Sequence, residues 1–211
     1  MNIDSRLIRY VEEEIIPLYD KFDKAHRRDH VNTVIEQSLL LASNYAVNVN
    51  MVYAIAAFHD VGLCKGREFH HIESADIVRG DKLLNSLFTA EEVAVIADAV
   101  EDHRASNKAA PRTLYGRIVA EADRVIDGNT ILRRTVQYGL SHYPSLSREE
   151  HYARACEHLK EKYGYGGYLK LWIPESANAA RLQEFREVIN DEKALKSLFE
   201  IIFDEECCDY A

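Results

Sequence analysis

Residues 56–66 read AAFHDVGLCKG, and they close an apolar run (MVYAIAAF, residues 51–58) with the pair His59 and Asp60. Both side chains ionise, and burying a polar group of this kind without a partner costs about 2–7 kcal/mol. A metal ion is one partner that satisfies an imidazole and a carboxylate together. The rest of the chain decides whether that interpretation holds.

The spacing of apolar residues predicts helices along almost the whole chain and no strand with a period of two. The 49–60 segment is apolar on nearly all sides, so we expect it to be central. Thr89 and Glu92 form a capping-box pattern that opens a helix. A helix that ends at about Ile126 is expected to stop at Gly128. The other expected helices cover 3–20, 29–45, 70–87, 129–140, 147–162, 176–190 and 192–204, with Ser147 as a cap.

Composition and charge limit the classes of protein to which the chain can belong. The chain has 211 residues, 47% hydrophobic and 29% charged, which suits one globular domain. A net charge of -9 argues against broad nucleic-acid binding, which needs a basic face. The first residues are charged, so we expect no signal peptide, and no apolar run is long enough to span a membrane. Four cysteines without a C-x-x-C pair indicate reduced thiols and a cytoplasmic protein.

Ionisable residues continue the apolar faces of four predicted helices. His30 lies four residues before Val34, His103 lies three after Val100, and Asp123 lies four after Val119. With His59 and Asp60, these groups would be costly to bury singly, but they can share a cation. Imidazoles mixed with carboxylates suit manganese, iron, cobalt, zinc or magnesium, as one ion or two.

Three segments, DHVNTVIEQSLLLA, AIAAFHDVG and VAEADRVID, resemble the signature of the HD-domain metal-dependent phosphohydrolase superfamily, whose pattern is H…HD…D. The resemblance implies an all-α, compact single domain over 1–211, with a motif region at 24–127 and C-terminal helices at 129–205 packing on it. It also implies a divalent metal held by His30, His59, Asp60 and Asp123. His26 is the second candidate for the first ligand, and we assign it instead to an outer-sphere or phosphate contact.

Relatives with this pattern carry further histidines that bind a second ion or face the substrate. HHIESA and VEDHR match those positions, which gives His70 or His71, and His103. The five-residue distance to Ala75 favours His70 over His71. Both roles, second metal or substrate contact, stay open for these residues.

The resemblance implies a metal-dependent phosphohydrolase that acts on a small nucleotide or another phosphate ester or anhydride through metal-activated water. A monoester, a diester and a pyrophosphate bond are all compatible with the sequence. Asp60, His103 and Lys65 are the expected catalytic residues, and His26, Arg27, Lys65 and Arg67 are expected to bind phosphate. The alternative is a silent module that binds a metal and a nucleotide. A membrane is not an expected partner, and a homodimer is among the states that the sequence allows.

The segment YGYGGYLKLWIPES, residues 163–176, is expected to be a Gly- and Tyr-rich loop. Its aromatic side chains could stack on a base or cover the site. Packing of the loop onto the helices is the favoured interpretation.

Overall fold

The computed structural model describes residues 2–23, 26–107 and 109–209, and within these ranges it contains only helices, turns and loops. The predicted all-α class is therefore confirmed. Contacts divide the chain into two compact units. Unit 1 comprises Met1–Arg124 and Trp172–Ser176, and unit 2 comprises Val125–Leu171 and Ala177–Ala211. That these two units form one domain stays a prediction.

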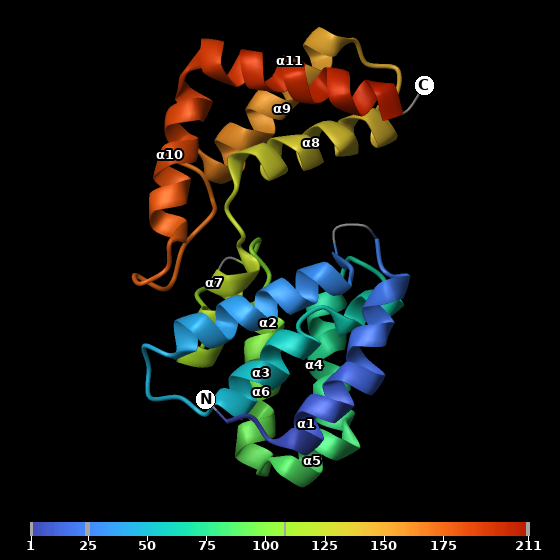
Figure 1. Cartoon of the computed structure of the whole chain (residues 1–211), viewed down its shortest axis with the longest axis vertical. Helices are drawn as coiled ribbons and strands as arrows, with labels where there is room; N and C mark the ends of the chain where they lie inside the picture. Colours follow the sequence, from blue (N-terminus) through green and yellow to red (C-terminus); the bar gives the residue numbers. More distant parts are fainter. Residues whose placement is uncertain (1, 24–25, 108, 210–211) are drawn as a thin grey trace. The chain divides into compact units, whose positions relative to one another are not determined.

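Unit 1 contains the predicted motif segments except for the last three residues of the third, Val125–Asp127 (Figure 1). It begins with three successive helical segments, α1, a π-helical turn η1 and a 3₁₀ segment η2, and continues with a bundle of longer helices. The bounds are α1 Ser5–Tyr10, η1 Val11–Ile15, η2 Ile16–Lys21, α2 Arg28–Ala42, α3 Val49–Phe58, η4 Val61–Lys65, α4 His70–Gly80, α5 Lys82–Leu87, α6 Ala90–Asp102 and α7 Leu114–Asp123.

Helix α3 is the centre of unit 1, as its apolar sequence predicted. Every residue from Ala54 to Phe58 has no solvent exposure. The helix contacts α2, α6 and α7, so its last turn ends in the interior of the bundle. Burial of these side chains stabilises the unit at roughly 25 cal/mol per Å² of apolar surface removed from water. The polar residues that follow α3 are therefore held on a rigid support.

Several predicted helix boundaries differ from the structure, and three of these differences have a clear physical reason. The 3–20 helix changes type twice, and Pro17, which lacks an amide donor, lies in the 3₁₀ segment. The 70–87 helix is broken at Asp81, whose side chain caps α5 by accepting from the Leu84 amide. Gly128 begins α8 instead of ending α7, because Asp127 caps the new helix and α7 stops at Asp123.

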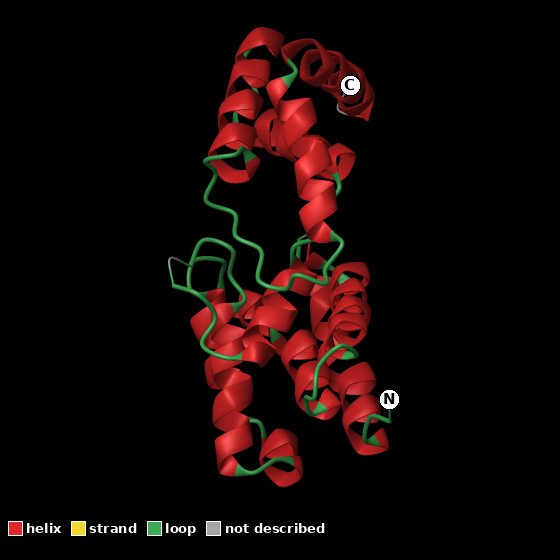
Figure 2. Ribbon diagram, turned by 90° about the vertical axis from the view of Figure 1, so that its left-hand side faces the viewer, coloured by secondary structure: helices red, strands yellow, loops and turns green. Residues whose placement is uncertain are grey.

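Unit 2 is built from α8 Gly128–His142, α9 Arg148–Tyr163, α10 Asn178–Asn190 and α11 Glu192–Asp209, which are joined by loops (Figure 2). The predicted cap at Ser147 is confirmed as a full capping box with Glu150. Leu159 and Phe199 are fully buried, and Arg148 Nη1 lies 2.6 Å from Glu200 Oε2 between α9 and α11. None of the helices in the described ranges combines the length and the apolar character needed to cross a membrane.

Candidate metal centre

The end of α3 presents His59 and Asp60 to the interior of unit 1. His59 is the C-cap residue, and Asp60 leaves the helix with φ -112° and ψ 4°. The hydroxyl of the buried Tyr19 donates to the Ala57 carbonyl at 2.8 Å and accepts from the Asp60 amide at 3.3 Å. Tyr19 thus satisfies backbone groups that the end of the helix would leave unpaired. Helical spacing did not predict this role of Tyr19, although a buried tyrosine hydroxyl usually has a hydrogen-bond partner.

Gly62 allows α4 to approach the end of α3. Its amide donates to Ser74 Oγ at 2.8 Å, and a Cβ at this position would lie 2.2 Å from the His70 carbonyl oxygen. Any side chain at residue 62 would therefore push α4 away. The close approach places His70, the first residue of α4, beside Asp60. This packing is a physical reason for a glycine two residues after Asp60 and for a serine at residue 74.

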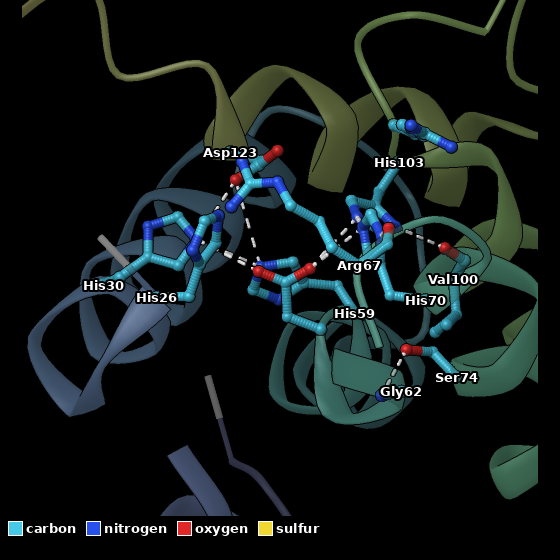
Figure 3. Close-up of polar contacts among 12 residues, drawn as sticks. His26, His30, His59, Gly62, Arg67, His70, Ser74, Val100, His103 and Asp123 are labelled. Carbon is cyan, nitrogen blue, oxygen red and sulfur yellow. Dashed lines mark hydrogen bonds and ion pairs between the residues drawn. The ribbon is translucent and has the colours of Figure 1, made fainter. Parts of the chain in front are cut away.

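The structure brings the four predicted metal ligands together (Figure 3). His30 Nε2 lies 3.2 Å from His59 Nε2 and 3.2 Å from Asp123 Oδ1. Asp60 Oδ2 lies 3.3 Å from His59 Nε2 and 3.7 Å from His30 Nε2. His59 Nε2 and Asp123 Oδ1 are 3.9 Å apart. Among the described residues, His30, His59 and Asp60 form one group whose donor atoms all lie within 4.8 Å of one another.

A second group uses the other oxygen of Asp60. Asp60 Oδ1 lies 3.3 Å from His70 Nε2 and 3.4 Å from His103 Nε2, and these two nitrogens are 3.3 Å apart. The three donors again lie within 4.8 Å of one another. One carboxylate therefore faces two sets of imidazoles, one on each oxygen. His71 is not in this group, since its ring packs edge-on against His70 at 5.6 Å.

Backbone carbonyls orient three of the imidazoles. Nδ1 of His59, His70 and His103 lies 2.6–2.8 Å from the carbonyl oxygen three residues earlier in each case. A carbonyl oxygen only accepts, so each Nδ1 carries a proton and donates it. In the neutral ring, Nε2 then has a free lone pair that points into the cluster. Histidine ligands of metals are typically fixed by such a bond from the opposite ring nitrogen.

The electrostatics of the cluster fit a cation. Burial lowers the pKa of His59, but the charges of Asp60 and Asp123 outweigh it and raise the pKa to about 9. Burial alone would raise the pKa of Asp60, yet His59 and His103 hold it well below the usual range. Burial lowers the pKa of His70 to about 4. The carboxylates therefore retain their charge and need positive charge nearby, which a proton on His59 or a divalent ion supplies.

The residues present fit a divalent metal. Two pairs of Nε2 atoms face each other at 3.2 and 3.3 Å, a separation at which neutral imidazoles repel unless a proton or a cation lies between their lone pairs. His59 and Asp60 have no more than 3% exposure, so water cannot screen them. Imidazole nitrogen with carboxylate oxygen is a donor set suited to ions such as manganese, iron, cobalt and zinc.

The four residues predicted to bind phosphate differ in their exposure and in their hydrogen-bond partners. His26 Nδ1 lies 2.8 Å from Asp23 Oδ1, and its ring meets the His30 ring edge-on at 5.7 Å. Arg67 is 71% exposed, and its Nη1 lies 3.3 Å from Asp23 Oδ2. Lys65 Nζ pairs with Glu73 Oε2 at 2.6 Å on the outside of α4. Arg27 is the N-cap residue of α2 and makes no side-chain capping bond.

Comparison with known families agrees with this geometry. Residues 27–126 match the model of the HD domain family. This part of the chain therefore belongs to the HD-domain superfamily, as the three signature segments predicted. HD domains bind divalent metals and are generally metal-dependent phosphohydrolases. No solved structure matches the chain at a significant level.

Proposed function

We propose that the protein is a metal-dependent phosphohydrolase that acts on a small phosphorylated substrate, in particular a nucleotide. The observation that carries the proposal is the shared carboxylate of Asp60, with one imidazole group on each of its two oxygens. His30, His59, Asp60 and Asp123 would hold the first ion. Asp60, His70 and His103 would hold a second ion.

The chemistry follows from the positions of the side chains. When bound, divalent ions in such sites polarise a phosphoryl oxygen and lower the pKa of a coordinated water towards neutrality. Asp60 is 3% exposed and lies between the two imidazole groups, where its negative charge would offset part of the positive charge of the bound ions. His26 and Arg67 would bind the phosphate, because phosphoryl transfer spreads negative charge over oxygens that need nearby donors. Lys65 would have to leave Glu73 to contribute.

The nucleotide assignment depends on local charge. The chain has a net charge of -9, yet Arg67 and Arg104 lie in the segments that carry His70 and His103. Arg104 Nη1 donates to the Glu68 carbonyl at 2.8 Å, which ties these two segments together beside the cluster. Such local cations favour a small polyanion over a long nucleic acid, which needs an extended basic face.

The test is a hydrolysis panel with manganese, cobalt, zinc or magnesium added. Nucleoside mono-, di- and triphosphates, pyrophosphate and p-nitrophenyl phosphate are the substrates. His59→Gln and Asp60→Asn should lose more than about 100-fold in turnover, since even outer-sphere partners of metal ligands typically account for 10–100-fold. His158→Gln, a histidine of α9 in unit 2, is the matched control and should retain the wild-type rate.

Two outcomes of this panel would contradict the proposal. Turnover that persists in both His59→Gln and Asp60→Asn would remove the cluster from the reaction. Binding of metal and nucleotide without turnover of any substrate would favour the alternative, a silent binding module.

A further inference from the structure

The carboxylate of Asp23 uses both of its oxygens near the metal cluster. Its Oδ1 accepts from His26 Nδ1 at 2.8 Å, and its Oδ2 accepts from Arg67 Nη1 at 3.3 Å. The backbone adds a third bond, because the His26 amide donates to the Asp23 carbonyl at 2.9 Å. Asp23 thus joins two residues that are separated by 41 positions in sequence, a link that the sequence analysis did not predict.

Arg67 crosses the cluster from one imidazole group to the other. Its carbonyl oxygen accepts from His70 Nδ1 at 2.7 Å, which anchors the backbone beside the second group. Its guanidinium reaches Asp23, which holds His26 next to His30 of the first group. Figure 3 shows the Arg67 side chain extending over His59 towards His26 and Asp123. A phosphate bound to the ions would therefore lie close to this guanidinium.

An exposed arginine needs a partner to hold such a position. The Arg67 side chain is 71% exposed, and within the described part of the chain Asp23 is the only acceptor recorded for its guanidinium. That bond uses Nη1 and leaves the other N–H groups of the guanidinium for a ligand. His26 is similarly fixed through Nδ1, which leaves Nε2 for a ligand. Nε2 donates to a phosphate oxygen when the ring is protonated, and it accepts from a P–OH group when the ring is neutral.

We propose that Asp23 is a positioning residue of the substrate site, whose carboxylate holds Arg67 and His26 over the metal cluster so that both contact a substrate phosphate. The inference rests on the proposed function, because it assumes that phosphate binds at the cluster. Ordering these side chains before the ligand arrives removes an entropic cost from binding.

Because Asp23 is negatively charged, the direction in which Asp23→Ala changes the phosphate affinity shows which role the residue has. A carboxylate close to a bound phosphate repels it, so removal of the charge alone would strengthen phosphate binding. Loss of positioning would instead weaken it, by about tenfold if one or two side chains must be ordered anew. Asp23→Ala therefore distinguishes a positioning residue from a competitor for Arg67.

The experiment measures binding of inorganic phosphate to the full-length, manganese-loaded protein by titration calorimetry. The variants are Asp23→Ala, Arg67→Ala and the double variant, with Asp23→Glu as the conservative replacement. Asp20→Ala is the matched control, since Asp20 is 53% exposed against 52% for Asp23 and also pairs with an arginine, Arg28. Manganese content and the thermal unfolding midpoint are measured for every variant.

We expect Asp23→Ala to raise the Kd for phosphate about tenfold and Asp23→Glu to recover part of it, while Asp20→Ala and the unfolding midpoint stay unchanged. In the Arg67→Ala background the effect of Asp23→Ala should shrink, because one of the two positioned groups is already gone. With a substrate from the hydrolysis panel, KM should rise while kcat stays within about twofold.

Tighter phosphate binding by Asp23→Ala, or a Kd equal to that of Asp20→Ala, would overturn the positioning role and leave the proposed function standing. Effects of Asp23→Ala and Arg67→Ala that simply add would also overturn it. A manganese-loaded wild-type protein that binds no phosphate would remove both the proposed function and this inference.

Discussion

Metal binding at the cluster should release a proton from His59. The perturbation is a change of pH during titration of the metal-free protein with manganese. The pKa of His59 is about 9 in the folded, metal-free protein, because Asp60 and Asp123 outweigh the effect of burial. Below that pH the ring carries a proton on Nε2, the atom that faces the cluster, and an ion must displace it.

The magnitude follows from this single displaced proton. The apparent affinity for manganese should rise about tenfold per pH unit, hence about 300-fold from about pH 6 to pH 8.5, and should level off near pH 9. The stability of the metal-free protein should change in the opposite direction. A pKa raised from 6.5 to about 9 stabilises the fold fully below about pH 6.5, and this contribution is lost as the pH rises through 9. It amounts to at most about 3 kcal/mol.

Calorimetry in buffers with different ionisation enthalpies measures both the affinity and the number of protons released. Denaturant unfolding of the metal-free protein at the same pH values gives the stability. A manganese affinity that does not change with pH, or binding without proton release at about pH 7, would refute the assignment of His59 as a protonated ligand. His158→Gln should show the same pH dependence as the wild-type protein.

Three further variants test the support of the site. Gly62→Ala should lower the free energy of unfolding by at least about 2 kcal/mol in denaturant titrations, because its Cβ would lie 2.2 Å from the His70 carbonyl oxygen. Tyr19→Phe should cost about 1–2 kcal/mol in the same assay and should also weaken manganese binding, since the lost hydroxyl bonds two backbone groups at the end of α3. His103→Ala should reduce the bound metal in elemental analysis from two ions to one, whereas Asp60→Asn should weaken both sites.

Each of these predictions has an outcome that contradicts it. Wild-type stability in Gly62→Ala would show that α4 tolerates a larger separation from α3. Unchanged manganese binding in Tyr19→Phe would limit the hydroxyl to a structural role. A wild-type stoichiometry of one ion would remove His70 and His103 from metal binding. Thr89→Ala is a useful reference, because loss of its capping box should cost about 1 kcal/mol without any effect on metal binding.

The sequence predicted the parts of the structure that depend on local patterns. The capping box at Thr89 and the cap at Ser147 are each encoded within four residues, and both are present. The central position of α3 followed from its apolar composition. His30 and Asp123 could be placed on inward faces from helical spacing alone, and in the structure they meet at 3.2 Å. Local patterns suffice in these cases because the helix geometry fixes the direction of each side chain.

Features that depend on packing between segments were not predictable. Gly128 is a local exception, because it fits a helix end as well as a helix start and the adjacent Asp127 caps the new helix. The hydroxyl of Tyr19 reaches across 38 positions to the Ala57 carbonyl. Lys65 was expected to bind phosphate, but its ion pair with Glu73 holds the side chain on the outside of α4. Choices of this kind depend on distances between elements, which no spacing along the chain contains.

The return of Trp172–Ser176 to unit 1 makes that unit discontinuous in sequence. The Trp172 amide donates to the buried Oε2 of Glu121 at 2.6 Å, within α7 and two residues before Asp123. A fragment cut at the ends of the family match would lose both this anchor and Tyr19. Helices α8 and α9 are, in effect, an insertion within the sequence of unit 1. A protein that consists of unit 1 alone would therefore need a short linker in place of residues 125–171, because truncation after Arg124 would also remove Trp172–Ser176.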